Sequence, residues 1–155
     1  MKNMPLDELE RLLIERQCLR LMTNYCLYLD DRNTEAFLDL FVDDAVWIQM
    51  NEPPYELSGR EAVRRFVEAR STRKINRHLM LNPQVTVLSA NQATAFSIGL
   101  VIDGPRQGDT LPVPLNGIEL LVEYRDTFRL DPKGWRIVRR EMTRIIDKKA
   151  PVAAG

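Results

Sequence analysis

The clearest hydrophobic pattern in the chain is a strict alternation that runs from His78 to Val87. Every second position is apolar, and the positions between are polar or amphipathic. One side carries His78, Met80, Asn82, Gln84 and Thr86, and the other carries Leu79, Leu81, Pro83, Val85 and Val87. A period of two with β-branched residues predicts a strand with one apolar face. His78 is the only histidine in the chain, and histidine is the side chain that ordinarily titrates near neutrality. We expect His78 and Asn82 to face the interior, with Leu79 and Leu81 on the opposite face.

Ahead of this strand, apolar residues recur at helical spacing. The first such stripe predicts a long helix over residues 6–29, and it consists of Ile14, Cys18, Leu21, Met22, Tyr25 and Leu29. A second, short helix is expected over residues 35–41, with Thr34 as its cap. A strand over residues 45–50 follows, and then a third helix over residues 60–70.

Beyond residue 73 the pattern indicates strands only. They are expected over residues 78–87, 92–102, 118–129 and 135–145, with a Gly- and Pro-rich loop over residues 103–116. In the second of these strands one face is bulky, and the other carries the small residues Ala93, Ala95, Ser97, Gly99 and Val101. The small face either lets a helix approach closely or leaves room for a ligand, and the sequence leaves both interpretations open.

The order of these elements predicts the fold class. Helices that come first, followed by a run of antiparallel strands, favour an α+β fold with the sheet curled over the long first helix. A chain of 155 residues suits one domain, which we place at residues 1–147. Residues 148–155 are expected to form a disordered tail.

Composition excludes several classes of function. The 22 basic and 22 acidic residues give a formal net charge of zero, so no overall field favours nucleic acid or an anionic membrane. No apolar run is long enough to span a bilayer, and the N-terminus has no secretory pattern. Cys18 and Cys26 would lie about 12 Å apart along one helix, which is too far for a disulfide. Two unpaired thiols fit a reducing compartment, so we expect a cytoplasmic protein.

The motifs of common cofactor and metal sites do not occur in the sequence. The glycine-rich nucleotide motifs, the G-x-S-x-G elbow and the H-E-x-x-H helix motif are all missing. One histidine with no carboxylate pair at ligand spacing does not make a metal site. We therefore expect neither a metal nor a cofactor.

Six segments together resemble the SnoaL-like group of the NTF2-like superfamily. They are residues 25–30 (YCLYLD), 37–47 (FLDLFVDDAVW), 57–63 (LSGREAV), 77–82 (RHLMLN), 124–129 (YRDTFR) and 134–140 (GWRIVRR). Their order and spacing extend the resemblance over roughly residues 6–142. It implies an NTF2-like cone, in which three N-terminal helices pack in a curved, mainly antiparallel sheet.

Within that superfamily, the resemblance points to the branch of scytalone dehydratase and the bile-acid dehydratases. These enzymes use a tyrosine and an aspartate of the first helix with a histidine of the sheet, and the spacing of Tyr25, Asp30 and His78 is similar. The resemblance implies that His78 is a general base, that Asp30 holds its tautomer and that Tyr25 polarises a carbonyl. Arg140 matches a family arginine that serves either as a substrate contact or as a structural ion-pair partner. Scytalone dehydratase has a second histidine, which this chain lacks.

The residues themselves are consistent with this chemistry. Histidine can remove a proton beside a carbonyl group, a carboxylate on its other nitrogen orients it, and a phenol supports the developing enolate. Loss of a β-hydroxyl then completes a dehydration without a cofactor. We therefore predict a cofactor-independent dehydratase or isomerase acting on a small apolar hydroxy-carbonyl compound of steroid, polyketide or terpenoid type.

Further contacts with such a substrate are expected from Trp47, Met80, Asn82, Ser97 and Arg140. The alternative is a non-catalytic small-molecule-binding or scaffold module, such as a protein resembling a dioxygenase small subunit. An apolar pocket in which His78 and Asp30 touch would favour the enzyme, and a cone filled by side chains would argue against it. A curled open sheet usually covers its outer face by self-association, so we also expect a homodimer or higher homo-oligomer.

Overall fold

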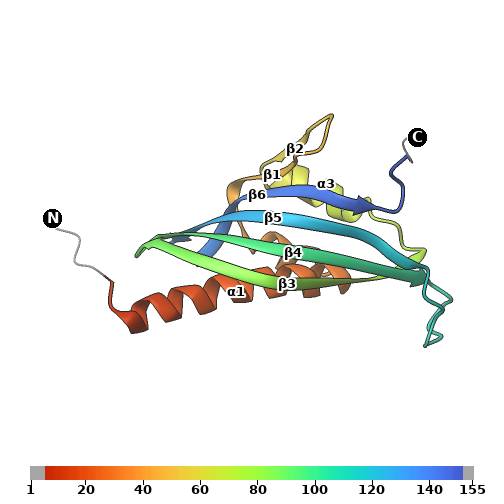
Figure 1. Ribbon diagram of the computed structural model, residues 1–155, viewed down its shortest axis with the longest axis horizontal. Helices are drawn as coiled ribbons and strands as arrows, with labels where there is room; N and C mark the ends of the chain where they lie inside the picture. Colours follow the sequence, from red (N-terminus) through yellow and green to blue (C-terminus); the bar gives the residue numbers. More distant parts are fainter. Residues whose placement is uncertain (1–5, 152–155) are drawn as a thin grey trace.

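The computed structural model describes residues 6–151, which form three helices and one six-stranded sheet (Figure 1). The elements are α1 (Glu8–Asp30), α2 (Thr34–Leu38), β1 (Phe41–Gln49), β2 (Tyr55–Ser58), α3 (Arg60–Glu68), β3 (Lys74–Ser89), β4 (Gln92–Pro105), β5 (Gly117–Asp131) and β6 (Gly134–Asp147). The predicted α+β class is confirmed. The ends of the predicted domain and of its tail, residues 1–5 and 152–155, lie outside the described residues.

The sheet has the strand order β2-β1-β6-β5-β4-β3. All neighbouring strands are antiparallel except β1 and β6, which pair in parallel. The long strands β3 to β6 form a twisted meander, and α1 runs lengthwise along one of its faces (Figure 1). The hydrophobic core therefore lies between this helix and the inner face of the sheet.

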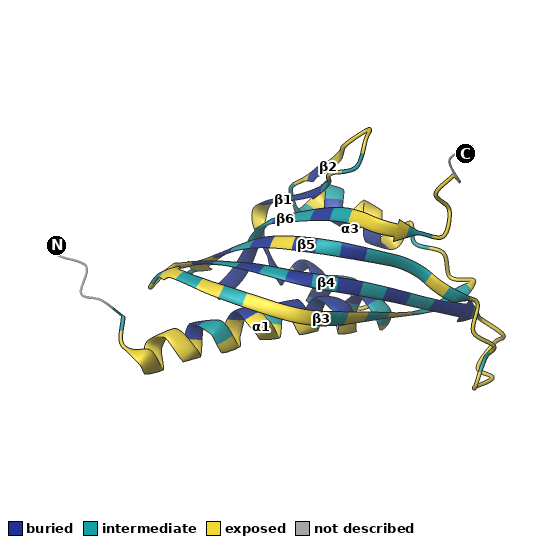
Figure 2. Cartoon of the chain, viewed as in Figure 1, coloured by how far each residue is buried: buried dark blue, intermediate teal, exposed yellow. Residues whose placement is uncertain are grey.

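α1 is a capped helix with one buried side. Asp7 accepts a hydrogen bond from the Glu10 amide at 2.7 Å, and Glu10 accepts one from the Asp7 amide at 2.9 Å, which is a capping box. Figure 2 shows exposed first turns and a buried stripe further along, consisting of Ile14, Cys18, Met22, Tyr25, Cys26 and Leu29. The two cysteines are buried and unpaired. Burial raises the pKa of Cys18 to about 12 and that of Cys26 to about 11, so both act as small apolar residues.

Two local predictions need correction, and one strand was not predicted. Asn33, rather than Thr34, caps α2, because the Asn33 side chain accepts a hydrogen bond from the Ala36 amide at 3.2 Å. The strand predicted at residues 45–50 begins at Phe41, and its irregular register before Val46 leaves two aspartates exposed within the strand. The short edge strand β2 was not predicted, because only four residues form it and three of them are exposed.

The alternation that starts at His78 is broken in the middle of β3. Asn82 has a positive φ of 49°, and the pairing with β4 shifts by one residue between Leu81 and Gln84. Asparagine tolerates this left-handed conformation, and the inserted residue makes a β-bulge that reverses which side chains face inward. Leu79 and Leu81 lie on the outer face, as predicted. The inward position predicted for Asn82 is wrong, because Asn82 is exposed.

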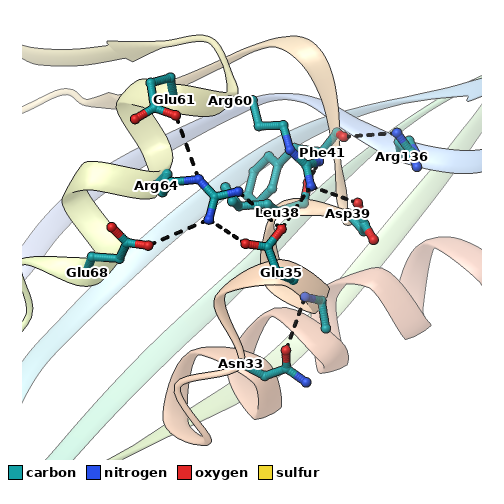
Figure 3. A network of polar contacts seen from close by, with 11 residues as sticks. Asn33, Glu35, Leu38, Asp39, Phe41, Arg60, Glu61, Arg64, Glu68 and Arg136 are labelled. Carbon is teal, nitrogen blue, oxygen red and sulfur yellow. Dashed lines mark hydrogen bonds and ion pairs between the residues drawn. The ribbon is translucent and has the colours of Figure 1, made fainter.

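α3 is held to α2 by a network of ion pairs (Figure 3). Arg64 contacts Glu35, and Arg60 donates to Asp39 at 3.0 Å and to the Leu38 carbonyl at 3.1 Å. Arg60 and Arg64 of α3 are therefore engaged with α2 and the residue that follows it. This contact positions α3 and the residues that follow it over one end of the sheet.

The chain after β6 continues in a turn. The Lys148 amide donates to the Glu119 carbonyl at 3.0 Å, and the Ala150 amide donates to the Asp147 carbonyl at 2.9 Å. Within residues 6–151, no helix combines the length and the apolar character needed to cross a membrane.

Candidate functional site

The last residue of α1 reaches across to β3. Asp30 Oδ1 lies 2.5 Å from His78 Nδ1, and Asp30 Oδ2 accepts the His78 backbone amide at 2.8 Å. The side chains of Asp30 and His78 are only 7% and 13% exposed. The helix stops here because Arg32 adopts a positive φ of 58° and the Asn33 amide turns back to the Tyr28 carbonyl. The structure thus brings together the two residues that the sequence analysis paired.

The contact with Asp30 determines which nitrogen of the His78 imidazole can act as a base. An ionised carboxylate only accepts hydrogen bonds, so Nδ1 carries the proton and Nε2 of the neutral ring is the acceptor. No partner of Nε2 is found among residues 6–151. His78 therefore offers a free basic nitrogen whose orientation is held by Asp30.

His78 lies in the wall of a cavity of about 320 Å³. This volume falls at the small end of the range for small-molecule sites, about 300–1,000 Å³. Much of the wall is apolar and comes from Leu29, Trp47, Phe66, Val101, Leu120 and Met142. Trp47 and Phe66 pack with tilted rings whose centroids lie 5.2 Å apart. The interior of the cone is therefore hollow at the position of His78.

Tyr25 lies in the same wall and is only 3% exposed. Its ring packs against Phe37 and Tyr124, with centroid distances of 5.0 Å and 6.0 Å. Among the described residues, its hydroxyl has no hydrogen-bond partner, so it can donate to a ligand in the cavity. The cavity thus presents the imidazole of His78 and the phenol of Tyr25 to its contents, and the phenol of Tyr124 lies in the same wall.

The guanidinium of Arg140 packs against the aromatic ring of Tyr25. Its guanidinium carbon lies 3.9 Å from the ring centroid of Tyr25 and 4.3 Å from that of Tyr124. Asp126 holds it in a two-point ion pair, with distances of 2.7 Å to Nε and 2.6 Å to Nη2. Burial by itself would lower the pKa of Arg140, but the Asp126 carboxylate outweighs burial and holds this pKa above its ordinary value. Arg140 is wholly buried, is not among the residues that line the cavity, and lies as the ion-pair partner of Asp126.

Comparison with known proteins assigns the family. The profile of the SnoaL-like domain matches residues 10–141. The chain belongs to the SnoaL-like domain family. No curated protein matches the chain at a significant level.

Solved structures with the same fold cover nearly the whole SnoaL-like chain. A protein of Novosphingobium aromaticivorans, assigned provisionally as a scytalone dehydratase, is 25% identical with a TM-score of 0.73, over 94% of this chain and 93% of that one. An NTF2-like protein with a cystatin-like fold from the same species is 24% identical with a TM-score of 0.68, over 94% and 95%. ActVI-ORFA of Streptomyces coelicolor is 16% identical with a TM-score of 0.69, over 85% and 97%.

In this SnoaL-like domain, one of the remaining predicted contacts reaches the cavity and three do not. Trp47 lines it. Met80 packs against the core, and Ser97 is wholly buried. Asn82 is carried outward by the bulge in β3. Met80, Asn82 and Ser97 are therefore not among the residues that line the cavity.

The small face of β4 serves close packing. A Cβ atom on Gly99 would lie 2.5 Å from Cε2 of Tyr124 and 2.8 Å from Cγ2 of Val122. The small residues thus let the side chains of β5 approach, and among the five of them only Val101 reaches the cavity. The close neighbours of Gly99 are thus side chains of the adjacent strand β5, which is neither of the two interpretations that the sequence left open.

Several cavity residues of the SnoaL-like domain were not found from the sequence. The polar ones are Arg70, Ser71, Lys74, Asn76, Glu119, Tyr124, Arg144 and Lys149. Lys74 and Asn76 precede His78 by four and two positions on β3, so extending the alternation backward would have found them. Glu119 accepts hydrogen bonds from both, at 3.2 Å and 2.8 Å. Within residues 6–151, no group of three or more potential metal ligands is present.

Proposed function

We propose that this SnoaL-like domain is a cofactor-independent dehydratase or isomerase of a small apolar hydroxy-carbonyl compound. The observation that carries the proposal is the contact between Asp30 and His78 in the wall of a cavity. The likeness to the provisionally assigned scytalone dehydratase supports the same reaction class. The apolar wall fits a substrate of steroid, polyketide or terpenoid type.

The proposed reaction begins with removal of a proton from the carbon next to the carbonyl group. His78 Nε2 takes this proton, and the electron pair of the C–H bond moves into the carbonyl group to give an enolate. The Tyr25 hydroxyl donates a hydrogen bond to the enolate oxygen. Asp30 stabilises the imidazolium that forms, without itself taking up the proton.

The second step decides between the two reaction types. In a dehydration, the enolate electrons return to form the carbon–carbon double bond, and the β-hydroxyl leaves as water with the proton of the imidazolium. In an isomerisation, His78 returns the same proton to another carbon of the conjugated system. Both outcomes balance with no oxidant, reductant or metal.

Tyr25→Phe separates a catalytic phenol from a core residue. The ring and its packing remain, but the hydrogen bond to the enolate is lost, so we expect kcat to fall by about 10²–10³ with the dissociation constant little changed. Screening hydroxy-carbonyl compounds by thermal shift supplies the substrate, calorimetry gives affinity, and product analysis gives turnover. Tyr28→Phe is the matched control, because Tyr28 lies on the same helix and does not line the cavity. Unchanged turnover in Tyr25→Phe would remove Tyr25 from the reaction.

The same screen tests the competing function. A non-catalytic binding module would use the same cavity and would bind a hydroxy-carbonyl compound tightly without converting it. Tight binding with no product from any candidate compound would therefore favour the binding module over the enzyme.

The proposal includes self-association through the outer face of the sheet. Leu79 and Leu81 are 39% and 37% exposed there, and they pair across the strands with Leu100 and Ile98. Exposed apolar side chains gathered on one face of a sheet are typical of an interface. We expect sedimentation to give a dimer for the wild type and a monomer for the double variant Leu79→Lys with Leu81→Lys. An unchanged mass would move the interface to another surface.

A further inference from the structure

Arg70 is a cavity residue that the proposed reaction does not use. It lies two residues beyond the end of α3, and its side chain lies in the cavity wall together with Tyr25 and His78. Its Nη1 donates to the Leu29 carbonyl at 2.8 Å. This hydrogen bond holds the guanidinium at the end of α1, one residue before Asp30 in the sequence.

Arg70 has no acidic partner among residues 6–151, in contrast to Arg60 and Arg64 of the preceding helix. A guanidinium has five N–H donors, and one of those of Arg70 is used by the Leu29 carbonyl. Burial lowers the pKa of Arg70, which is the signature of a cation removed from water without full compensation. Such a group gains most from a ligand that brings a negative charge.

The other charged residues around the cavity also leave the positive charge of Arg70 without a matching negative charge. The wall and mouth carry Arg70, Lys74, Arg144 and Lys149 against the single carboxylate of Glu119. Lys74 is balanced by Glu119 and by Asp103, at 3.2 Å and 2.8 Å, and Arg144 is balanced by Asp147 at 2.8 Å. Lys149 is exposed to solvent. Arg70 is therefore the partly buried cation of this wall whose charge is not matched.

We propose that the cavity binds an acid, and that Arg70 holds its carboxylate while the hydroxy-carbonyl part of the molecule faces His78. The planar fork of a guanidinium matches the two oxygens of a carboxylate, and charge-assisted hydrogen bonds of this kind are strong. The inference rests on the proposed function for the reacting end of the molecule. Recognition of the acid is separate, because it concerns binding alone.

The competing explanation is that Arg70 serves only to donate a hydrogen bond to a free carbonyl group at the C-terminal end of α1. A basic side chain that bonds a last-turn carbonyl does stabilise a helix terminus. That role uses one donor and gives no preference between charged and neutral ligands. A pair of probes that differ only in charge separates the two explanations.

The experiment uses 2-naphthoate and 2-naphthamide, which share one ring system and differ in charge. Binding is followed by the NMR signals of the His78 imidazole, which report on this cavity because the chain has no other histidine. We expect wild type to bind naphthoate about 10- to 100-fold more tightly than naphthamide, as hydrogen bonds to a charged group predict. Equal affinities, or no binding of naphthoate at millimolar concentration, would overturn the inference without need of a variant.

Two variants then test the residue. Arg70→Met keeps an apolar stem, and Arg70→Gln keeps an N–H donor for the Leu29 carbonyl, so the second guards against loss of the fold. In both, the preference for naphthoate should be lost while the affinity for naphthamide stays the same. Arg65→Met is the matched control on α3, because Arg65 is exposed and lies outside the cavity. If the Arg70 variants bound both probes equally more weakly than wild type, the role of Arg70 would be purely structural.

The outcome is distinguishable from failure of the proposed function. A preference for naphthoate that depends on Arg70, in a protein that converts no hydroxy-carbonyl compound, would support acid binding and remove the enzyme. Turnover of neutral substrates with no preference for naphthoate would support the enzyme and remove acid binding.

Discussion

A His78→Gln variant is expected to lose about 10²–10⁴-fold in kcat while its affinity for substrate changes little. Glutamine can still donate a hydrogen bond to Asp30, but it cannot take up the proton that the reaction must remove. The backbone contact between the His78 amide and Asp30 does not depend on the side chain, so the end of α1 should stay in place. Product analysis at saturating substrate, together with calorimetry on the same preparation, measures the two quantities.

The control for this variant lies on the same strand. Met80 points to the same side of β3 as His78 but does not line the cavity, so Met80→Leu should leave kcat within about a factor of a few. If kcat of His78→Gln falls no further than that of Met80→Leu, the base lies elsewhere and the proposed mechanism is wrong.

The part of the site that the sequence could predict depends on periodicity and on one helix end. The stripe through Tyr25 and Leu29 orients the last turns of α1 toward the sheet, and the positive φ at Arg32 ends the helix where its polar residues begin. A helix that stops at Asp30 can then deliver its carboxylate to the neighbouring strand. The contact with His78 follows from these local features together with the family resemblance.

The errors on β3 have a local cause that a hydrophobic pattern does not reveal. The apolar alternation continues without a break through Leu81 and Pro83, so the pattern reads as one regular strand. A single left-handed residue at Asn82 nevertheless inserts a bulge and exchanges the two faces beyond it. The backbone conformation of one residue thus decides which later side chains face inward.

The residues that were missed come together only in the tertiary structure. Glu119 meets Lys74 and Asn76 although more than 40 positions separate them in the chain. Arg70 belongs to the cavity because α3 ends against the last turn of α1. The hydrophobic periodicity of neighbouring residues does not reveal strand register or helix packing of this kind.

The largest effect on stability is expected from Asp126→Asn. The change is nearly isosteric, but it leaves Arg140 as an uncompensated charge at a position with no exposure. Removing one partner of a buried pair typically costs about 3–5 kcal/mol, because the remaining charge keeps its desolvation penalty. Urea unfolding measures this as a lower midpoint with an unchanged slope.

Two further variants test whether the loss of stability in Asp126→Asn comes from the unpaired buried charge of Arg140. Glu123→Gln lies on the same strand in an exposed pair with Arg125 at 4.0 Å, so its effect should stay within about 1 kcal/mol. Replacing both partners, Asp126→Leu with Arg140→Met, should recover much of the loss, because no unpaired charge remains buried. Its folded form should still turn over less substrate, since Tyr25 loses the guanidinium 3.9 Å from its ring. A cost below about 1 kcal/mol for Asp126→Asn would mean that solvent reaches Arg140 and that the support of Tyr25 is not rigid.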